Sequence, residues 1–399
     1  MQYSKFKAFL IPLFLSTPIY AATIDRSKSN VEIAFAEGNK ADFEVTTGVT
    51  HTSNFLYSDH DEASESGYFL TADAFLQAHS DTQLLQVYGK ATRNQFEDYS
   101  DDSHTTVTAL GKYYFKLSSE QRLFASATYD ELFEYRGTGL SLGNGEELSE
   151  GDERVDMLFN VGYQYGRTDS VSRFNLTAGV FDSEYQTRKA QTKAFNYERS
   201  FVASNLDYLA TGATYITLEV DFSDFTFDNS PNFDRDELLI LAGIRNELSE
   251  ASSVILLLGT QKVSYDLGGA DKNEFAWKAS YSWLPTDFLN ISFASERKTN
   301  ETPEVQNDLR VDERFGIAAR YLFSDSLAFT AKADIIKADI ESTGSSREDD
   351  LVVYDLSLNY SINERVGVYA QIVHRDRDSQ LDDFSYQRID SNFGISVKF

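Results

Sequence analysis

The side chains with the most familiar catalytic chemistry are sparse in this sequence. Its 399 residues contain no cysteine, which excludes thiol catalysis and disulfide bonds, and only five histidines. No histidine stands at the spacing of a zinc site, and no serine lies in a nucleophile elbow. The glycines of residues 137–143 faintly resemble a nucleotide loop, but no strand–helix–strand unit surrounds them. The sequence therefore predicts neither an enzyme nor a cofactor.

The ionisable residues are mostly acidic and occur in clusters. The formal net charge is −27. Asp59, Asp61, Asp382 and Asp383 belong to such clusters, where carboxylates could bridge through divalent cations to anionic lipopolysaccharide. A cation-selective pore mouth is the alternative role for these carboxylates. Nucleic acid is not among the expected partners.

These charges lie on or between stretches in which apolar and polar residues alternate. Val155, Met157 and Phe159 alternate with Asp156 and Asn160, and the pattern repeats from about residue 43 onward. A period of two puts the apolar residues on one face of a strand, whereas helical spacing would scatter them. The mean hydropathy of −0.38 and the 14% of aromatic residues suit a membrane barrel, whose lipid-facing and lumen-facing residues alternate.

The breaks between these stretches alternate strictly in length. Short ones such as residues 118–121 are followed by long charged ones such as residues 136–153 and 341–348. In outer-membrane barrels the short turns face the periplasm and the long loops face outward. We therefore expect an all-β fold, a transmembrane antiparallel up-and-down β-barrel in a bacterial outer membrane. About eighteen strands are expected. Sixteen is the alternative, because residues 195–208 form the weakest predicted strand. No proline of the mature chain is expected inside a strand.

The N-terminal residues have the pattern of an export signal. Lys5 and Lys7 precede a short apolar run over residues 8–15, and small residues follow up to Ala22. That run is shorter than the roughly 20 residues of a membrane-spanning helix. We expect a cleaved signal peptide over residues 1–22, a periplasmic lead over 23–41 and the barrel over 42–399.

Three segments carry a more specific resemblance. Residues 273–286, with Trp283 and Pro285, precede a strand at 289–297; residues 209–220 form a second hairpin, and residues 386–399 end the chain. Together they resemble the putative β-barrel porin family linked to exopolysaccharide and capsule export. The typical family turn has a basic residue after its proline, where Thr286 and Asp287 stand here. The resemblance implies that Phe393, Ile395, Val397 and Phe399 act as an assembly signal read by the barrel-assembly machinery.

The same resemblance implies an export channel for a surface polysaccharide. A charge that faces lipid at mid-depth costs roughly 2–4 kcal/mol, so wall cations should face the lumen. There they would contact substrate, or merely pair with carboxylates such as Asp334 and Asp355. The candidate lumen contacts are Trp277, Lys278, Arg297, Arg320 and Lys332.

Two other functions are compatible with the same pattern. One is a diffusion porin for small solutes, with the loop over residues 136–153 folded into the pore. The other is a non-conducting surface or adhesion barrel. For the export channel, the expected partners are outer-membrane lipid and lipopolysaccharide, the assembly machinery, and components of polysaccharide biosynthesis or export.

Overall fold

The described residues form one closed sheet of 18 antiparallel strands, each hydrogen-bonded to its sequence neighbours. The computed structural model describes residues 38–60, 62–167, 169–249, 251–267, 271–300, 307–342 and 345–399. The last strand pairs with the first, from Glu44 opposite Lys398 to Thr52 opposite Asp390, and this pairing closes the barrel. The weakest predicted strand is present as β8 (Tyr197–Thr211), so the expectation of eighteen strands is confirmed and sixteen is wrong. The signal peptide and most of the periplasmic lead lie outside the described residues.

The strands run almost the full length of the described chain. In order they are β1 (Lys40–Thr52), β2 (Glu65–His79), β3 (Gln83–Phe96), β4 (Thr105–Lys116), β5 (Gln121–Glu134), β6 (Asp152–Tyr165), β7 (Ser172–Tyr185), β8, β9 (Thr214–Phe227), β10 (Arg235–Ser249), β11 (Ser252–Tyr265), β12 (Lys272–Thr286), β13 (Leu289–Asn300), β14 (Asn307–Ser324), β15 (Leu327–Ser342), β16 (Ser345–Ser361), β17 (Val366–Ser379) and β18 (Tyr386–Lys398).

The helices are short and lie between strands, at the end of the barrel with the longer loops. They are η1 (Ser100–Asp102), η2 (Gly139–Ser141), η3 (Gly145–Glu147), α2 (Lys189–Thr192), η4 (Lys193–Phe195), η5 (Pro231–Phe233) and η6 (Asp382–Phe384). No helix within the described ranges is long and apolar enough to cross a membrane.

The alternation seen in the sequence sorts side chains between two faces of the wall. On β6, Met157, Phe159 and Val161 are exposed apolar residues, whereas Asp156 and Asn160 on the other face are buried. The same division recurs around the barrel, with large apolar side chains exposed at every second position. A surface of this kind is stable only against hydrocarbon. The exposed apolar face is therefore the membrane face, and the polar face lines the lumen.

Aromatic side chains gather on the membrane face near the short turns. Phe288, Tyr321 and Phe323 form edge-to-face pairs with ring centroids 5.6 and 4.8 Å apart. Phe43 on β1 meets Phe399 beyond β18, at 5.6 Å. Amphipathic and aromatic rings are favoured at the membrane–water boundary, so this group marks the periplasmic interface.

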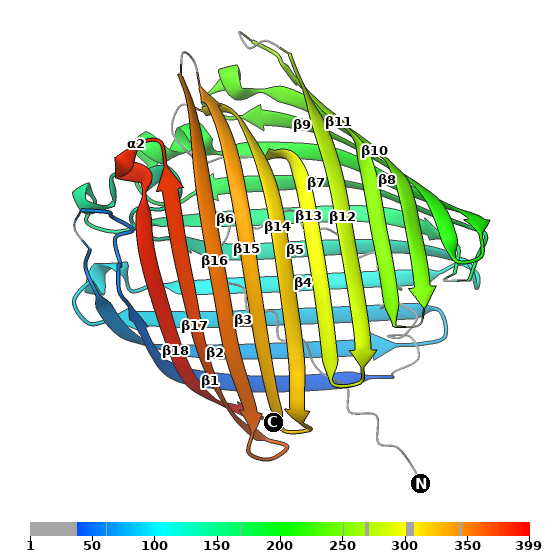
Figure 1. The fold of residues 1–399 in the computed structure, drawn as a ribbon, viewed down its shortest axis with the longest axis horizontal. Coiled ribbons are helices and arrows are strands. Elements are labelled where there is room, and N and C mark those ends of the chain that lie inside the picture. The colour runs from blue at the N-terminus through cyan, green and yellow to red at the C-terminus, as the bar shows by residue number, and fades with distance from the viewer. Residues whose placement is uncertain are drawn as a thin grey trace.

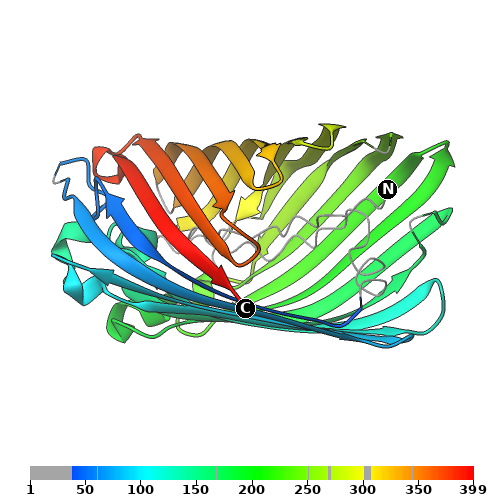
Figure 2. The same cartoon turned by 90° about the horizontal axis from the view of Figure 1, so that it is seen from below.

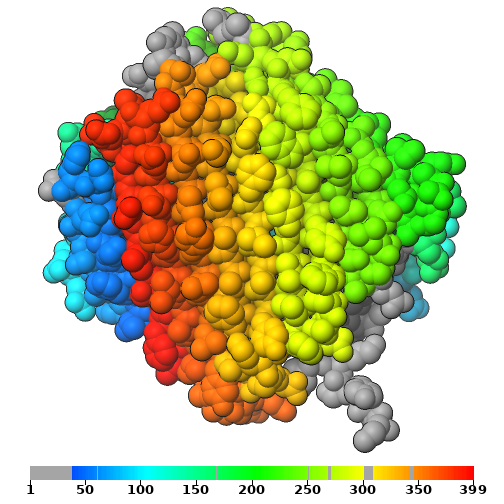
Figure 3. Space-filling model, viewed as in Figure 1, coloured from blue at the N-terminus to red at the C-terminus, as the bar shows by residue number. Residues whose placement is uncertain are grey.

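The strands of the near and far walls of the barrel are inclined in different directions. In Figure 1, β12–β18 run down the near side while β1–β8 run across behind them. Figure 2 shows the same barrel from below, with the strands of the two walls on either side. In Figure 3, the side chains of β10–β18 form a continuous outer surface on the near wall.

Two details differ from the sequence-based expectations. Pro285 lies inside β12, although no proline was expected within a strand; the register between β12 and β13 shifts between Trp283 and Thr286, next to the turn. A proline, which lacks an N–H donor, is tolerated at such an irregular strand end. The loop expected over residues 341–348 is mostly strand, because β15 and β16 remain paired up to Ser342 and Ser345.

Candidate transport channel

The lumen face of the wall carries acid–base pairs. Lys278 on β12 lies 3.2 Å from a carboxylate oxygen of Glu219 on β9, and Arg314 lies 2.7 Å from Asp334. On the neighbouring strands β7, β8 and β10, the Asp207 carboxylate pairs with two arginines, with nitrogen–oxygen distances of 3.2 Å to Arg173 and 3.6 Å to Arg245. Pairing of this kind leaves a lumen that is rich in hydrogen-bonding groups and has little local excess of either charge.

Three of the five predicted lumen residues lie on the lumen face. Lys278 is one, and Lys332 on β15 is another, with its ammonium group 3.5 Å from Asp355. Arg320 on β14 stands opposite Asn290 and Thr330. It lies two positions from Ala318, which pairs with Lys332, so Arg320 and Lys332 share the lumen face. Their contact with a transported molecule stays a prediction.

The other two predicted lumen residues are on the membrane face, so that part of the prediction is wrong. Trp277 pairs in register with both Leu258, which is exposed to the membrane side, and Arg297. The Trp277 indole donates to Ser295 Oγ at 2.9 Å, and its ring lies 5.8 Å from that of Phe275.

Arg297 can occupy the membrane face because it lies near the extracellular end of β13. Its guanidinium lies 3.0 Å from oxygens of both Glu274 and Glu313. A cation on the outer face costs roughly 2–4 kcal/mol at the bilayer midplane but only about 0–1 kcal/mol near an interface. The expectation for Arg297 applied the midplane cost to a residue at the rim.

The acidic clusters do not gather into a metal site in the described residues. No group of three or more histidine, aspartate or glutamate side chains there is arranged to hold an ion. Asp382 and Asp383 lie in η6, and Asp383 is 4.0 Å from the exposed His60. Asp59 is an exposed residue of the same rim, and Asp61 lies outside the described residues. Cation bridging by these loops stays a prediction.

The predicted assembly signal lies on the membrane face of the closing strand. Phe393, Ile395 and Phe399 are exposed, and Val397 pairs with Val45 of β1 and Val366 of β17. The position suits a segment that enters the membrane while the barrel closes. Its recognition by the assembly machinery is a separate question that this geometry leaves as a prediction.

Four extracellular loops form a packed unit at one side of the mouth, which we call the loop cap. It consists of residues 53–60, 62–64, 97–104, 135–151 and 380–385. Phe55 is fully buried at its centre, stacked on Tyr99 at 4.7 Å and edge-on to Phe96 at 4.9 Å. Gly137 lies at a φ of +78°, and a Cβ there would meet the Leu56 carbonyl oxygen at 1.9 Å, so glycine is required.

The loop cap is held together by buried charges. The Arg136 guanidinium pairs with Asp102, donates to the Leu148 carbonyl at 2.7 Å and lies over the Tyr99 ring at 4.8 Å. Asp102 also accepts from the Gly151 amide at 2.8 Å. Burial raises the pKa of the Asp102 carboxyl, and Arg136 opposes that rise. Each of the two buried charges is therefore stabilised by the other.

The loop cap is also joined to the lumen face of the last strand. Arg388 of β18 donates to the carbonyl oxygens of Asn54 and Phe55, at 3.2 and 3.4 Å, and lies over the Tyr57 ring at 4.1 Å. The first loop is thus anchored to a lumen-facing residue of β18. The loop over residues 136–153, considered as a pore constriction, packs against these neighbouring loops.

His104 makes the loop cap sensitive to acid. Its ring is stacked on Phe133 at 3.9 Å; one ring nitrogen lies 2.7 Å from the Asp102 carbonyl oxygen and the other 3.0 Å from the Asn94 amide. Burial, with a smaller contribution from the Arg93 charge, lowers the pKa of His104 to about 4, and the hydrogen bond to the Asp102 carbonyl only partly opposes this shift. The folded cap therefore favours the neutral imidazole.

We expect the loop cap to lose stability as the pH falls from about 6.5 to about 4, because the opened cap binds a proton that the folded cap excludes. The loss should approach roughly 3 kcal/mol and stop below pH 4. Hydrogen exchange of residues 94–104 in detergent, measured across this range, checks it. His104→Asn should flatten the profile; an unchanged profile in that variant would contradict the assignment.

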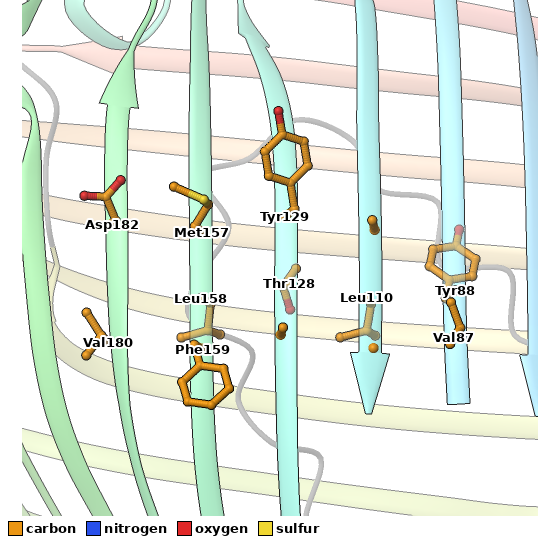
Figure 4. A pocket seen from close by; sticks show the side chains of 13 residues that line it. Val87, Tyr88, Leu110, Thr128, Tyr129, Met157, Leu158, Phe159, Val180 and Asp182 are labelled. Carbon is orange, nitrogen blue, oxygen red and sulfur yellow. The ribbon is translucent and has the colours of Figure 1, made fainter. Parts of the chain in front are cut away.

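A hollow of about 540 Å³ opens on the outer wall over β3–β7. It is lined by Val87, Met157, Phe159 and Val180, all exposed apolar residues of the membrane face. Figure 4 shows Tyr129, Met157 and Asp182 along its upper side, on neighbouring strands. Because this face meets hydrocarbon, the hollow is part of the lipid contact surface and is separate from the lumen.

Solved structures similar to this chain are outer-membrane barrels with low sequence identity. OccK3 (OpdO) from Pseudomonas aeruginosa is 13% identical, with a TM-score of 0.47 over 92% of this chain and 97% of that one. The FrpB iron transporter from Neisseria meningitidis is 10% identical, with a TM-score of 0.48 over 92% and 82% of the two chains. The siderophore receptor PirA from Pseudomonas aeruginosa is 10% identical, with a TM-score of 0.46 over 90% and 80%. No curated protein matches the chain.

A family model gives the stronger result, because it matches residues 43–399, which include nearly all of the described strands. Nothing in this match or in the geometry points to catalysis. The chain therefore belongs to the family described as "Putative beta-barrel porin 2", and it is a porin-type β-barrel of the outer membrane.

Proposed function

We propose that the barrel is an outward channel for a surface polysaccharide. The observation that carries the proposal is the pairing of charges on the lumen face, as in Lys278–Glu219 and Lys332–Asp355. A wall of paired charges, amides and hydroxyls offers weak, replaceable hydrogen bonds along its length. Such a wall suits a hydrated polymer that must keep moving, since it has few sites that would hold a small ion tightly.

Neighbouring amides extend the paired charges into a continuous polar network. Gln371 donates to Asp355 at 3.0 Å, and Asn392 donates to Gln371 at 3.3 Å, so Lys332 is linked through Asp355 to β17 and β18. The network contains both donors and acceptors. A sugar chain carries the same mixture, with hydroxyls that donate and accept.

The partners that follow from this proposal are a synthesis and export apparatus on the periplasmic side and lipopolysaccharide on the outside. The wall has no energy source of its own, so outward movement would be driven by polymer synthesis. The packing of residues 136–151 within the loop cap is less favourable to the small-solute porin, which would use that loop as a constriction.

We expect large single-channel openings when the full protein is placed in planar bilayers, with openings blocked by oligosaccharides of increasing length. The reason is that a longer chain makes more of the weak wall contacts at the same time. Free passage of small sugars without length-dependent block would favour the diffusion porin. A barrel that conducts no ions would contradict both channel functions and favour the adhesion barrel.

A further inference from the structure

The sheet divides at the extracellular ends of β12 and β13. Pairing between these two strands stops at Trp277 opposite Arg297. β12 nevertheless continues along β11 to its first residue, Lys272, and β13 continues along β14 to its last. In Figure 1 the upper end of β13 bends away from β12. We call residues 297–300 of β13 and 309–312 of β14, which lie beyond the division, the inner flap.

The inner flap lies on the lumen side of its neighbours. Leu309 and Val311 are an even number of positions from Ile317, so they belong to the face of β14 that meets the membrane nearer mid-depth. Each is nevertheless only 5% exposed, and both form a buried cluster with Val263. Val263 is five positions from the membrane-exposed Leu258 and therefore faces the lumen. The outer face of the flap thus rests on the lumen face of β11, and the wall overlaps itself here.

A chain of buried hydrogen bonds holds the inner flap in this position. The Thr299 amide donates to Gln261 Oε1 at 2.9 Å, and the Thr299 hydroxyl donates to Glu237 at 3.1 Å. The Gln261 amide donates to the same Glu237 oxygen at 2.8 Å. Gln261 and Glu237 are lumen-facing residues of β11 and β10. A bond from β13 to β10 must cross the lumen face of β12, which agrees with the overlap.

Arg297 occupies the point where the two strands part. Its guanidinium donates to the Phe275 carbonyl oxygen, to Glu274 at 3.0 Å and to Glu313 at 3.0 Å. The Phe275 carbonyl is a main-chain acceptor on the β13 side of β12, beyond the last paired residue. A side chain therefore takes the place of main-chain pairing at the division.

The sequence of the inner flap also suits a place in the wall. Continued by three residues, the register of β12 and β13 would set residues 298–300 opposite residues 276–274. Thr299, Leu309 and Val311 would then share the outer face with the exposed Phe275. The polar residues of the flap would face the lumen, as they do now. A segment that fits two packings of the same strands has the character of a two-state element.

We propose that the inner flap is a gate of the channel. In the position described, it places a second layer of strands inside the mouth, and packed sheets lie about 10 Å apart. Opening moves the flap into the wall, completes the pairing of β12 with β13 and frees that part of the lumen. Cargo competes with the flap for the same space and so favours the open position. The inference rests on the proposed function and adds the regulation of the same channel.

The first test weakens the closed position in the full-length protein in planar bilayers. Gln261→Met removes the acceptor of the Thr299 amide and a donor to Glu237. We expect two conductance states, with the fraction of time in the wider state roughly tenfold greater in this variant than in the wild type. The recordings use ions alone, without sugars.

Gln77→Met is the matched control. Gln77 is also buried on the lumen face, donates to the Gly38 carbonyl at 2.8 Å and accepts from Gln86 at 2.8 Å. It belongs to the periplasmic end of β2, far along the wall from the inner flap. This variant should leave the occupancy of the two states unchanged. The electrophoretic shift between folded and heated protein shows that each variant forms the barrel.

The second test holds the open position with a disulfide. The natural chain has no cysteine, so Phe275→Cys with Thr299→Cys introduces the only two thiols. In the open position these residues stand directly opposite, at the roughly 4.5–5.5 Å between Cα atoms that a disulfide can bridge. Oxidation should keep the channel in the wider state, and reduction should restore both states. Ser282→Cys with Ser292→Cys, already opposite each other in the wall, should leave the states unchanged when oxidised.

Three results would overturn the gate and leave the polysaccharide channel intact. One is the same occupancy of states in Gln261→Met and the wild type. The second is a folded barrel in which the thiols at 275 and 299 cannot be oxidised to a disulfide. The third is a disulfide there that changes no conductance. Failure of oligosaccharides to block the open channel would instead contradict the proposed function, whatever the flap does.

Discussion

Replacing Arg136 by alanine should open the loop cap without dissolving the barrel. The substitution leaves the fully buried Asp102 carboxylate without its cationic partner, with only the Gly151 amide to stabilise the charge. Removal of one partner from a buried ion pair costs roughly 3–5 kcal/mol, so the cap should be mostly or fully unfolded at neutral pH. Hydrogen exchange and limited proteolysis of residues 135–151 measure this directly.

The matched control for Arg136 is Arg167→Ala. Arg167 pairs with Asp169 at 3.4 Å, but both side chains are largely exposed, and exposed pairs contribute about 0–1 kcal/mol. That variant should leave exchange in the cap unchanged. A double variant, Asp102→Asn with Arg136→Met, removes both charges and should recover part of the protection. Equal protection in the Arg136→Ala variant and the wild type would show that the pair does not hold the cap.

Placing an arginine at Ile317 should destabilise the whole barrel. Ile317 is 53% exposed on the membrane face of β14, well inside the strand. A cation on that face near mid-depth costs roughly 2–4 kcal/mol, a large part of the stability of a typical domain. The free energy of unfolding, measured by urea titration in lipid vesicles, should fall by that amount.

Ala318→Arg is the paired variant, one residue further along β14. It faces the lumen, in register with Ser292 and Lys332, where water and the carboxylate of Asp355 can accommodate a cation. We expect a change of less than about 1 kcal/mol. The difference between the two adjacent positions depends only on which face each occupies. Equal losses would mean that the faces of β14 are assigned wrongly.

The alternation of apolar and polar residues was enough to predict the fold and most strands. Period two follows directly from strand geometry, and a membrane enforces it at every position at mid-depth. This is why Met157 and Phe159 were correctly given a common face. The stretch that became β8 was the least certain, because Glu198, Arg199 and Ser200 at its start interrupt the apolar positions.

The prediction failed where the membrane no longer constrains the pattern. Near the interface both faces tolerate charge and aromatic rings, so alternation could not show that Trp277 and Arg297 face outward. Above the membrane a polar strand and a polar loop have the same composition, which is why the pairing that continues to Ser342 and Ser345 was read as a loop. Composition decides the face only where one face is dry.

The loop cap was beyond sequence reasoning for a different reason. Its contacts join residues far apart in the chain, such as Asp102 with Arg136 and Phe55 with Tyr135, and no local pattern announces them. The cross-strand pairing of Arg199 with Phe181 and Phe225 could not be predicted either, because the register of neighbouring strands depends on turn geometry.

The bonds from Arg388 to the first loop have a consequence for the order in which the molecule assembles. They join residues separated by 333 and 334 positions in sequence, across the junction of the first and last strands. Contacts of such long separation form late, after the chain between them is already organised. The contacts between the loop cap and β18 would then form only after the barrel has closed. Any sideways parting of β1 from β18 would first have to break them.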